Sequence, residues 1–100
     1  MSHVSVQSSF KVSGDVVFRE LDREAVVLNL ASGTYFGLNE VGTRIWHLIE
    51  EHAALAQVLD TIRGEYDAPP ERLEQDLIRL VGELVAKGLV VQSDDPSAAR

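Results

Sequence analysis

Residues 26–46 read VVLNLASGTYFGLNEVGTRIW, and this stretch decides the fold because it holds two strands, a turn and a helix start with almost no spacer. Residues 25–30 are rich in Val and Leu and predict a strand. Ser32-Gly33 predicts a turn, since glycine accepts positive φ without a Cβ clash. The β-branched and aromatic residues that follow predict a second short strand. Asn39 then stands at a helix N-cap position, where its side-chain oxygen accepts a backbone N–H of the first turn.

The residues before this stretch predict an arm and one further strand. Residues 1–14 are polar and Ser-rich, so we expect a flexible N-terminal arm with an extended piece at 10–12. Residues 15–21 alternate imperfectly and predict a first strand, joined to the next by a tight hairpin at Asp22-Arg23. Because the connections are short, the three strands are expected to form an antiparallel meander.

Apolar residues at helical spacing predict three helices after the sheet. We expect these helices over residues 40–51, 54–66 and 70–87. Gly88 is suited to end the third helix, and the apolar residues 89–91 predict a short final strand or wing.

The order of these elements predicts an α+β fold, a winged helix-turn-helix. In it, an N-terminal three-stranded antiparallel sheet is followed by three helices and a short C-terminal wing strand. The 100 residues fit one small domain, which we place over residues 15–92. Residues 93–100 are polar and are expected to be a disordered tail.

The composition argues against catalysis and metal binding. The chain has no cysteine, which excludes disulfides, thiolate metal sites and thiol nucleophiles. His47 and Glu51 lie four residues apart on the first predicted helix, but a metal site needs more ligands, so we favour an ordinary solvated pair. No glycine loop for a nucleotide and no setting for a nucleophilic serine is present. We therefore expect a non-enzymatic domain without metal or cofactor.

The charge and hydropathy argue against nucleic-acid and membrane partners. The formal net charge is −7 at pH 7, and an acidic surface repels phosphates and anionic lipids. The N-terminus lacks the basic and apolar regions of a signal peptide, and no apolar run reaches the length of a membrane span. We expect a cytoplasmic protein, as a monomer or weak dimer.

An ordered set of residues spans positions 16–91 and carries a family resemblance. The set is Leu28-Asn29-Leu30, Gly33-Thr34-Tyr35-Phe36, Leu38-Asn39, Gly42, Ile45-Trp46, Tyr66-Asp67, Asp76, Leu84 and Gly88-Leu89. It resembles the PqqD-like family, whose members are recognition elements for ribosomally synthesised and post-translationally modified peptides (RiPPs). The resemblance implies a peptide-modification chaperone that binds the leader segment of a precursor peptide and presents it to a modifying enzyme. Such partners include radical SAM proteins, peptidases and cyclases, in pyrroloquinoline quinone (PQQ) biosynthesis or another RiPP pathway.

A groove for this peptide is expected between a sheet edge and the third helix. Residues 34–37 should form an edge strand, whose unpaired backbone groups can pair with an added strand. The third helix has an apolar stripe wider than its own packing needs. By resemblance the groove residues are Tyr35, Phe36, Asp76, Leu77, Leu80 and Leu84, while the edge strand adds Thr34 and Gly37, and helical spacing adds Arg79, Glu83 and Lys87 at the rim.

Three aromatic side chains need a separate interpretation. Trp46 lies on the apolar face of the first predicted helix and is expected in the core. Tyr35 and Phe36 point to opposite faces of a strand, so one enters the core. The other is either a covered surface residue or a contact for a partner.

A DNA-binding transcriptional regulator is the alternative function, because winged helix-turn-helix domains commonly read DNA. The third helix would be the reading element. Its acidic residues outnumber its basic ones, which opposes docking into a groove lined by phosphates.

Overall fold

The computed structural model describes residues 8–52 and 54–93 of the chain. Its elements follow one another in the order that the sequence predicts. The α+β class, with a three-stranded antiparallel sheet, three helices and a C-terminal strand, is confirmed. The elements are β1 (Ser9–Val12), β2 (Val16–Leu21), β3 (Glu24–Asn29), β4 (Tyr35–Leu38), α1 (Glu40–His52), α2 (Leu55–Glu65), α3 (Pro70–Ala86) and β5 (Val90–Ser93).

The central sheet is an antiparallel meander in the order β2-β3-β4. Its register places Val27 of β3 between Phe18 of β2 and Phe36 of β4. The β2–β3 hairpin turns at Asp22 and Arg23, whose φ angles are 54° and 71°. Positive φ at both central residues is typical of the two-residue hairpin turns whose twist matches the right-handed twist of the flanking strands. The predicted hairpin is therefore confirmed, with two residues in the left-handed region.

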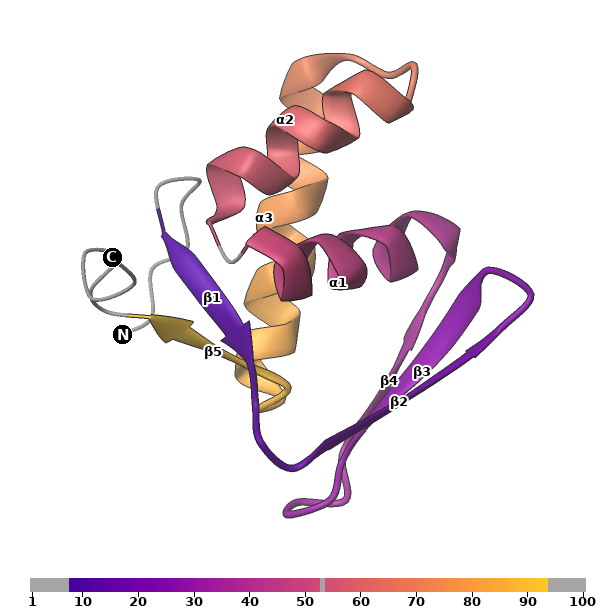
Figure 1. The fold of residues 1–100 in the computed structure, drawn as a ribbon, viewed down its shortest axis with the longest axis vertical. Helices are drawn as coiled ribbons and strands as arrows, with labels where there is room; N and C mark the ends of the chain where they lie inside the picture. The colour runs from indigo at the N-terminus through magenta and orange to yellow at the C-terminus, as the bar shows by residue number, and fades with distance from the viewer. Residues whose placement is uncertain (1–7, 53, 94–100) are drawn as a thin grey trace.

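A second, two-stranded sheet pairs β1 with β5, so that the first and last described strands lie side by side (Figure 1). Phe10 of β1 pairs with Gln92 and is fully buried in the core. Within the expected N-terminal arm, the extended piece predicted at 10–12 corresponds to β1, which pairs with β5 and brings Phe10 into the core. Residues 1–7 and 94–100, which include most of the predicted tail, lie outside the described residues.

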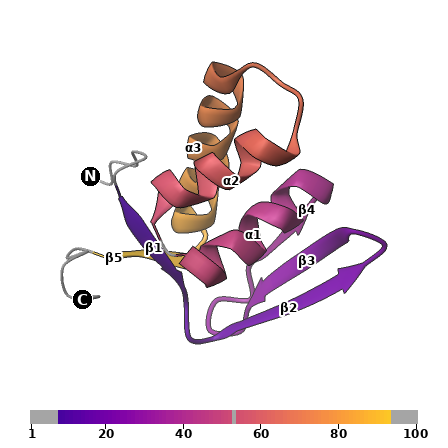
Figure 2. The ribbon, with the colours of Figure 1, turned by 45° about the horizontal axis from the view of Figure 1, so that its top comes forward.

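Helix α1 lies between the three-stranded sheet and the other two helices (Figure 2). Its Trp46 is fully buried, as predicted, and stacks on Phe18 of β2 with ring centroids 5.8 Å apart. Val27 of β3 is equally buried on the same side of the sheet. The face of the sheet toward α1, here the inner face, therefore contributes to the hydrophobic core.

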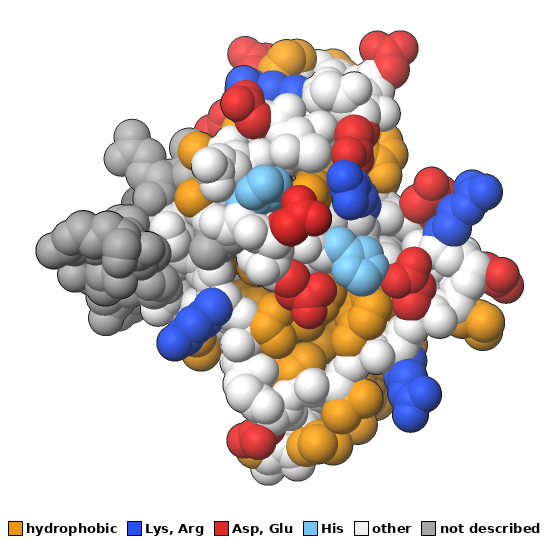
Figure 3. Space-filling model, viewed as in Figure 1, with side chains coloured by type: hydrophobic (Ala, Val, Ile, Leu, Met, Phe, Trp, Pro, Cys, Tyr) orange, Lys and Arg blue, Asp and Glu red, His pale blue; other side chains and the backbone are white. Residues whose placement is uncertain are grey.

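The surface over α1 carries acidic and histidine side chains, and a hydrophobic area lies below them between α1 and the strands (Figure 3). His47 contacts Glu20 of β2 at 2.8 Å and Glu50 at 3.5 Å. The predicted pairing of His47 with Glu51 is wrong, because the imidazole turns toward the sheet and Glu51 contacts His52 at 3.3 Å instead. Within residues 8–52 and 54–93, no group of three potential metal ligands comes together. No helix in the same ranges is long and apolar enough to cross a membrane.

Candidate functional site

Strand β4 forms one edge of the three-stranded sheet, since among the described residues it pairs with β3 alone. The prediction of an edge strand over residues 34–37 is confirmed with a shift of one residue, to Tyr35–Leu38. The strand leads directly into α1 through Asn39, whose side-chain oxygen accepts a 2.8 Å hydrogen bond from the backbone N–H of Gly42. This N-cap satisfies one of the otherwise unpaired N–H groups of the first turn and so helps α1 begin directly after β4.

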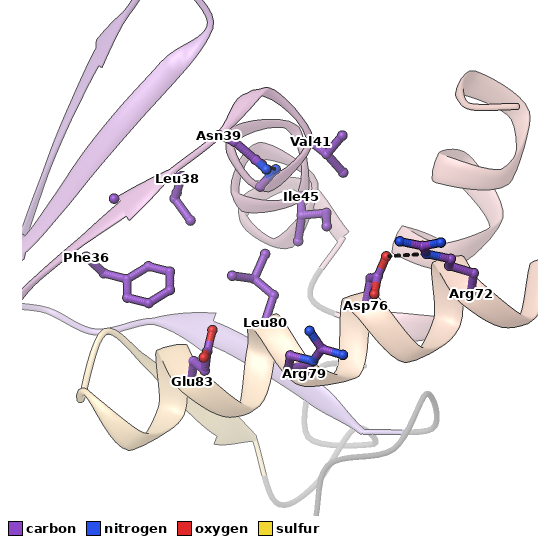
Figure 4. A pocket seen from close by; sticks show the side chains of 12 residues that line it. Phe36, Leu38, Asn39, Val41, Ile45, Arg72, Asp76, Arg79, Leu80 and Glu83 are labelled. Carbon is purple, nitrogen blue, oxygen red and sulfur yellow. Dashed lines mark hydrogen bonds and ion pairs between the residues drawn. The ribbon is translucent and has the colours of Figure 1, made fainter. Parts of the chain in front are cut away.

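A hollow of about 500 Å³ opens between β4, the start of α1 and one face of α3; we call it the inner hollow (Figure 4). Each of the three elements supplies part of its lining. The lining residues are Phe36, Gly37, Leu38 and Asn39 from β4 and its end, Val41, Gly42 and Ile45 from α1, and Arg72, Asp76, Arg79, Leu80 and Glu83 from α3.

The floor of the inner hollow is apolar. Phe36, Leu38, Ile45 and Leu80 point toward one another in Figure 4. Leu38 and Ile45 are each 4% exposed, whereas Phe36 and Leu80 pack only partly against the core and keep surface toward the opening. A ligand that covers these last two side chains removes apolar area from water, at about 25 cal/mol for each Å².

The rim on α3 is charged. Arg72 and Asp76 form an exposed ion pair at 3.8 Å, one helical turn apart. Arg79 and Glu83 continue the row along the helix (Figure 4) and make no ion pair within the described part of the chain. At the C-terminal end of α3, the Lys87 ammonium group lies 5.8 Å from the centre of the Phe36 ring. A bound chain would therefore meet both signs of charge around an apolar floor.

Six of the residues that the sequence predicts for the groove line the inner hollow. They are Phe36, Gly37, Asp76, Arg79, Leu80 and Glu83. Lys87 lies at its margin, against Phe36. Thr34 precedes β4 and does not line the hollow, and Tyr35 lies on the other face of the strand with 70% of its surface exposed.

Leu77 and Leu84, which the sequence also predicts for the groove, do not line the inner hollow. Leu77 is 1% exposed and Leu84 is fully buried. The apolar stripe of α3 is wide because it contacts two different neighbours. Leu77 and Leu84 contribute to the hydrophobic core, whereas Leu80, alone among the three predicted leucines, faces β4.

Helix α1 also lines the inner hollow, a contribution that the sequence does not predict. Val41 and Ile45 lie one turn apart at its start and face α3 across the inner hollow. Their i, i+4 spacing signals an apolar face, but only the tertiary structure tells which part of that face stays open. Arg72 is likewise not predicted, although its spacing of four residues from Asp76 marks it as a neighbour on the same side of α3.

The groups with perturbed ionisation lie away from the inner hollow. Arg44 of α1 donates two hydrogen bonds to the carboxylate of Glu65, at 2.9 and 2.6 Å. This contact lowers the pKa of Glu65 and raises the pKa of Arg44. Burial raises the pKa of the nearby Tyr66 hydroxyl. These contacts tie α1 to the end of α2 and are structural in character.

A family model described as coenzyme PQQ synthesis protein D (PqqD) matches residues 24–90, which include β3, β4, all three helices and the first residue of β5. The chain belongs to the PqqD family. This PqqD-family chain is also similar to solved structures. The chain of TbiB1 in complex with the TbiA(beta) leader peptide is 40% identical, with a TM-score of 0.77, and the match covers 85% of this chain and 99% of that one.

A second solved structure supports the fold of this PqqD-family chain. Lasso peptide synthetase B1, complexed with the leader peptide, is 24% identical, with a TM-score of 0.74, over 83% of this chain and 98% of that one. At this identity the likeness concerns the fold alone. None of the curated proteins matches the chain.

Proposed function

We propose that this PqqD-family protein binds the leader segment of a ribosomally synthesised precursor peptide and presents the peptide to a modifying enzyme in the cytoplasm, where such peptides are made. The observation that carries the proposal is the inner hollow beside β4. An edge strand with unpaired backbone groups borders an apolar cavity, and both are open to the same incoming chain.

Strand addition explains how such a site recognises a flexible peptide. The peptide backbone pairs with the free N–H and C=O groups of β4, which gives affinity independent of sequence. Alternate side chains then point into the inner hollow, where Phe36 and Leu80 offer apolar surface. Ordering a flexible chain opposes binding, so a few well-buried side chains supply most of the net binding energy.

The relative supports the same occupant. TbiB1, at 40% identity over nearly its whole length, is described in complex with the TbiA(beta) leader peptide. About two thirds of the present chain also match the PqqD family model. We therefore infer that the inner hollow binds a leader peptide in the same manner as its relative.

We propose a binding role without catalysis. The polar side chains around the inner hollow are Asn39, which caps α1, and the four charged residues on α3. Nucleophilic catalysis requires a nucleophile that is activated by an adjacent base, and the hollow pairs no such groups. The modifying chemistry is thus assigned to a partner enzyme, such as a radical SAM protein, a peptidase or a cyclase.

The proposal is tested by NMR titration of the isotope-labelled protein. The probes are the TbiA(beta) leader peptide and peptides selected from a displayed library of random linear 20-residue sequences. We expect saturable amide shifts at residues 35–38 and 72–83, and no such shifts with a scrambled peptide. Failure of both probes, or shifts concentrated on the exposed face of α2, would overturn the proposed function.

A further inference from the structure

The three-stranded sheet has a second hollow, on the face that points away from α1. Its volume is about 560 Å³, and we call it the outer hollow. Leu21, Val26 and Gly37 form its apolar part, and Arg19 and Glu24 bring one charge of each sign to it. Gly37, at the edge of the sheet, lines both the inner and the outer hollow.

The outer face carries several exposed apolar side chains although no described helix covers it. Cross-strand pairing places Arg19, Val26 and Gly37 in one row. On the inner face the neighbouring Val27 is fully buried, whereas Val26 is 49% exposed. Leu21 and Tyr35 share the outer face and are 77% and 70% exposed. An antiparallel sheet with one solvated face normally carries polar residues on that face. The exposed apolar side chains here therefore suit contact with a binding partner.

Gly37 has no local reason to be glycine. Its φ is not positive, unlike those of Gly33 and Gly88. A Cβ built at Gly37 would meet no atom within 4 Å. A glycine inside a strand weakens it, because it loses more conformational freedom on folding and packs no side chain. The missing side chain leaves an opening on the outer face at the edge of the sheet, directly beside Val26.

A strand added to β4 would place side chains at this opening. Successive side chains of a strand point to opposite faces, so those between the residues in the inner hollow must lie on the outer face. Strands lie about 4.8 Å apart, which puts Val26 about 10 Å from the added backbone. A long or aromatic side chain can lie across Gly37 and reach Val26, whereas alanine or serine cannot. Aromatic side chains cover edge glycines of sheets in the same manner.

We propose that the outer hollow is a second specificity site, which takes one aromatic or long apolar side chain of the bound peptide at the position facing Gly37. This inference rests on the proposed function, because the strand on β4 delivers the side chain. The bound peptide is then read on both faces of the sheet. A second copy of the chain is a poorer occupant, because two protomers that each carry a net charge of −7 repel each other.

The test is a double-mutant cycle between protein and peptide, measured by calorimetry. The probe is the tightest peptide from the displayed library, and its residue facing Gly37 is located by intermolecular NOEs. Gly37→Val fills the opening with a side chain that the backbone accepts. We expect at least a tenfold loss of affinity for the parent peptide. A peptide with alanine at the facing position should also bind at least tenfold more weakly to the parent protein. That alanine peptide should then respond less than twofold to Gly37→Val.

A matched pair of leucine variants guards against a general effect of the substitutions. Leu21→Ser removes an apolar wall of the outer hollow and should weaken binding several-fold. Leu30→Ser changes a leucine that is 62% exposed after the end of β3 and does not line the hollow, so it should leave affinity unchanged. Both variants are checked for an unaltered thermal transition.

The outcomes separate the inference from the proposed function. If peptides bind at β4 but the losses from Gly37→Val and from the alanine peptide simply add, the outer hollow is not a peptide site. The same conclusion follows if Leu21→Ser binds like the parent, or if Leu21 affects only self-association or capture of a partner protein. If no library peptide shifts the amides of β4, the proposed function fails and the inference fails with it.

Discussion

The side-chain amide of Asn29 donates a 2.9 Å hydrogen bond to the backbone carbonyl of Gly88. The two residues are 59 positions apart, and the bond joins the end of β3 to the residues that follow α3. The side-chain oxygen of Asn29 accepts hydrogen bonds from the backbone N–H groups of Ala31 and Ser32, at 2.9 and 3.3 Å. One side chain therefore shapes the turn before β4 and ties that turn to the end of α3, which sets the spacing between two walls of the inner hollow.

Asn29→Ala should lower the free energy of unfolding by about 1 kcal/mol, because it loosens the turn and removes one donor to the partly buried Gly88 carbonyl, which keeps the Ser13 hydroxyl as a donor at 2.8 Å. Asn29→Asp keeps the acceptor for the turn but not the donor, and should be destabilising as well. Urea unfolding measures both effects. Ser32→Ala, which removes one exposed 3.2 Å contact to the N–H of Thr34, is the control and should cost less than about 0.5 kcal/mol. A neutral Asn29→Asp variant would contradict the role of the Gly88 contact.

Leu80→Glu should weaken peptide binding by about 2 kcal/mol or more, since it places an unpaired charge in the apolar floor of the inner hollow. Gln75→Glu adds the same charge to an exposed site of α3 outside the hollow and should leave affinity unchanged. Calorimetry with a library-selected peptide gives the affinities, and circular dichroism first establishes that both variants are folded. Equal affinity of a folded Leu80→Glu variant and the parent would remove Leu80 from the site.

Phe10→Ala should lower the free energy of unfolding by about 3–5 kcal/mol, the usual cost of truncating a fully buried aromatic side chain. Lys11→Ala alters the next, exposed residue of β1 and should have an effect within about 0.5 kcal/mol. Guanidinium unfolding of both variants compares them directly. Similar stabilities for the two variants would mean that β1 does not contribute to the core.

The stability that Glu65 provides should depend on pH. Its pKa is lowered by the hydrogen bonds from Arg44, so its contribution is present above the ordinary carboxyl pKa and is lost as pH falls through the lowered value. The pair is partly exposed, which limits the effect of Glu65→Gln to about 0.5 kcal/mol at pH 7. Urea midpoints at pH 7 and at about pH 2, well below the ordinary carboxyl pKa, should show a smaller difference at the lower pH. Asp60→Asn on the exposed side of α2 serves as the control, and a pH-independent difference for Glu65→Gln would exclude the ion pair as its cause.

Much of the fold was predictable because local signals agree with the tertiary structure. Asn39 caps α1 as its position indicates, and Gly88 adopts a φ of 71° after α3. The turn at Asp22-Arg23 and the alternation in β3 likewise depend on neighbouring residues alone. Half of the residues that line the inner hollow were predicted from the sequence, among them Phe36 at the strand edge and Leu80 on α3.

The sequence by itself determined the elements, their order and the edge position of β4, because turn residues, caps and periodicity act over a few positions. The tertiary structure alone decided which residues share a space. It placed Phe10 in the core through a partner strand some eighty residues away, buried Leu77 and Leu84, and brought Val41 of α1 against α3. These outcomes depend on the packing of elements that are distant in the chain, and helical periodicity does not say which side of an apolar stripe meets the core and which stays open.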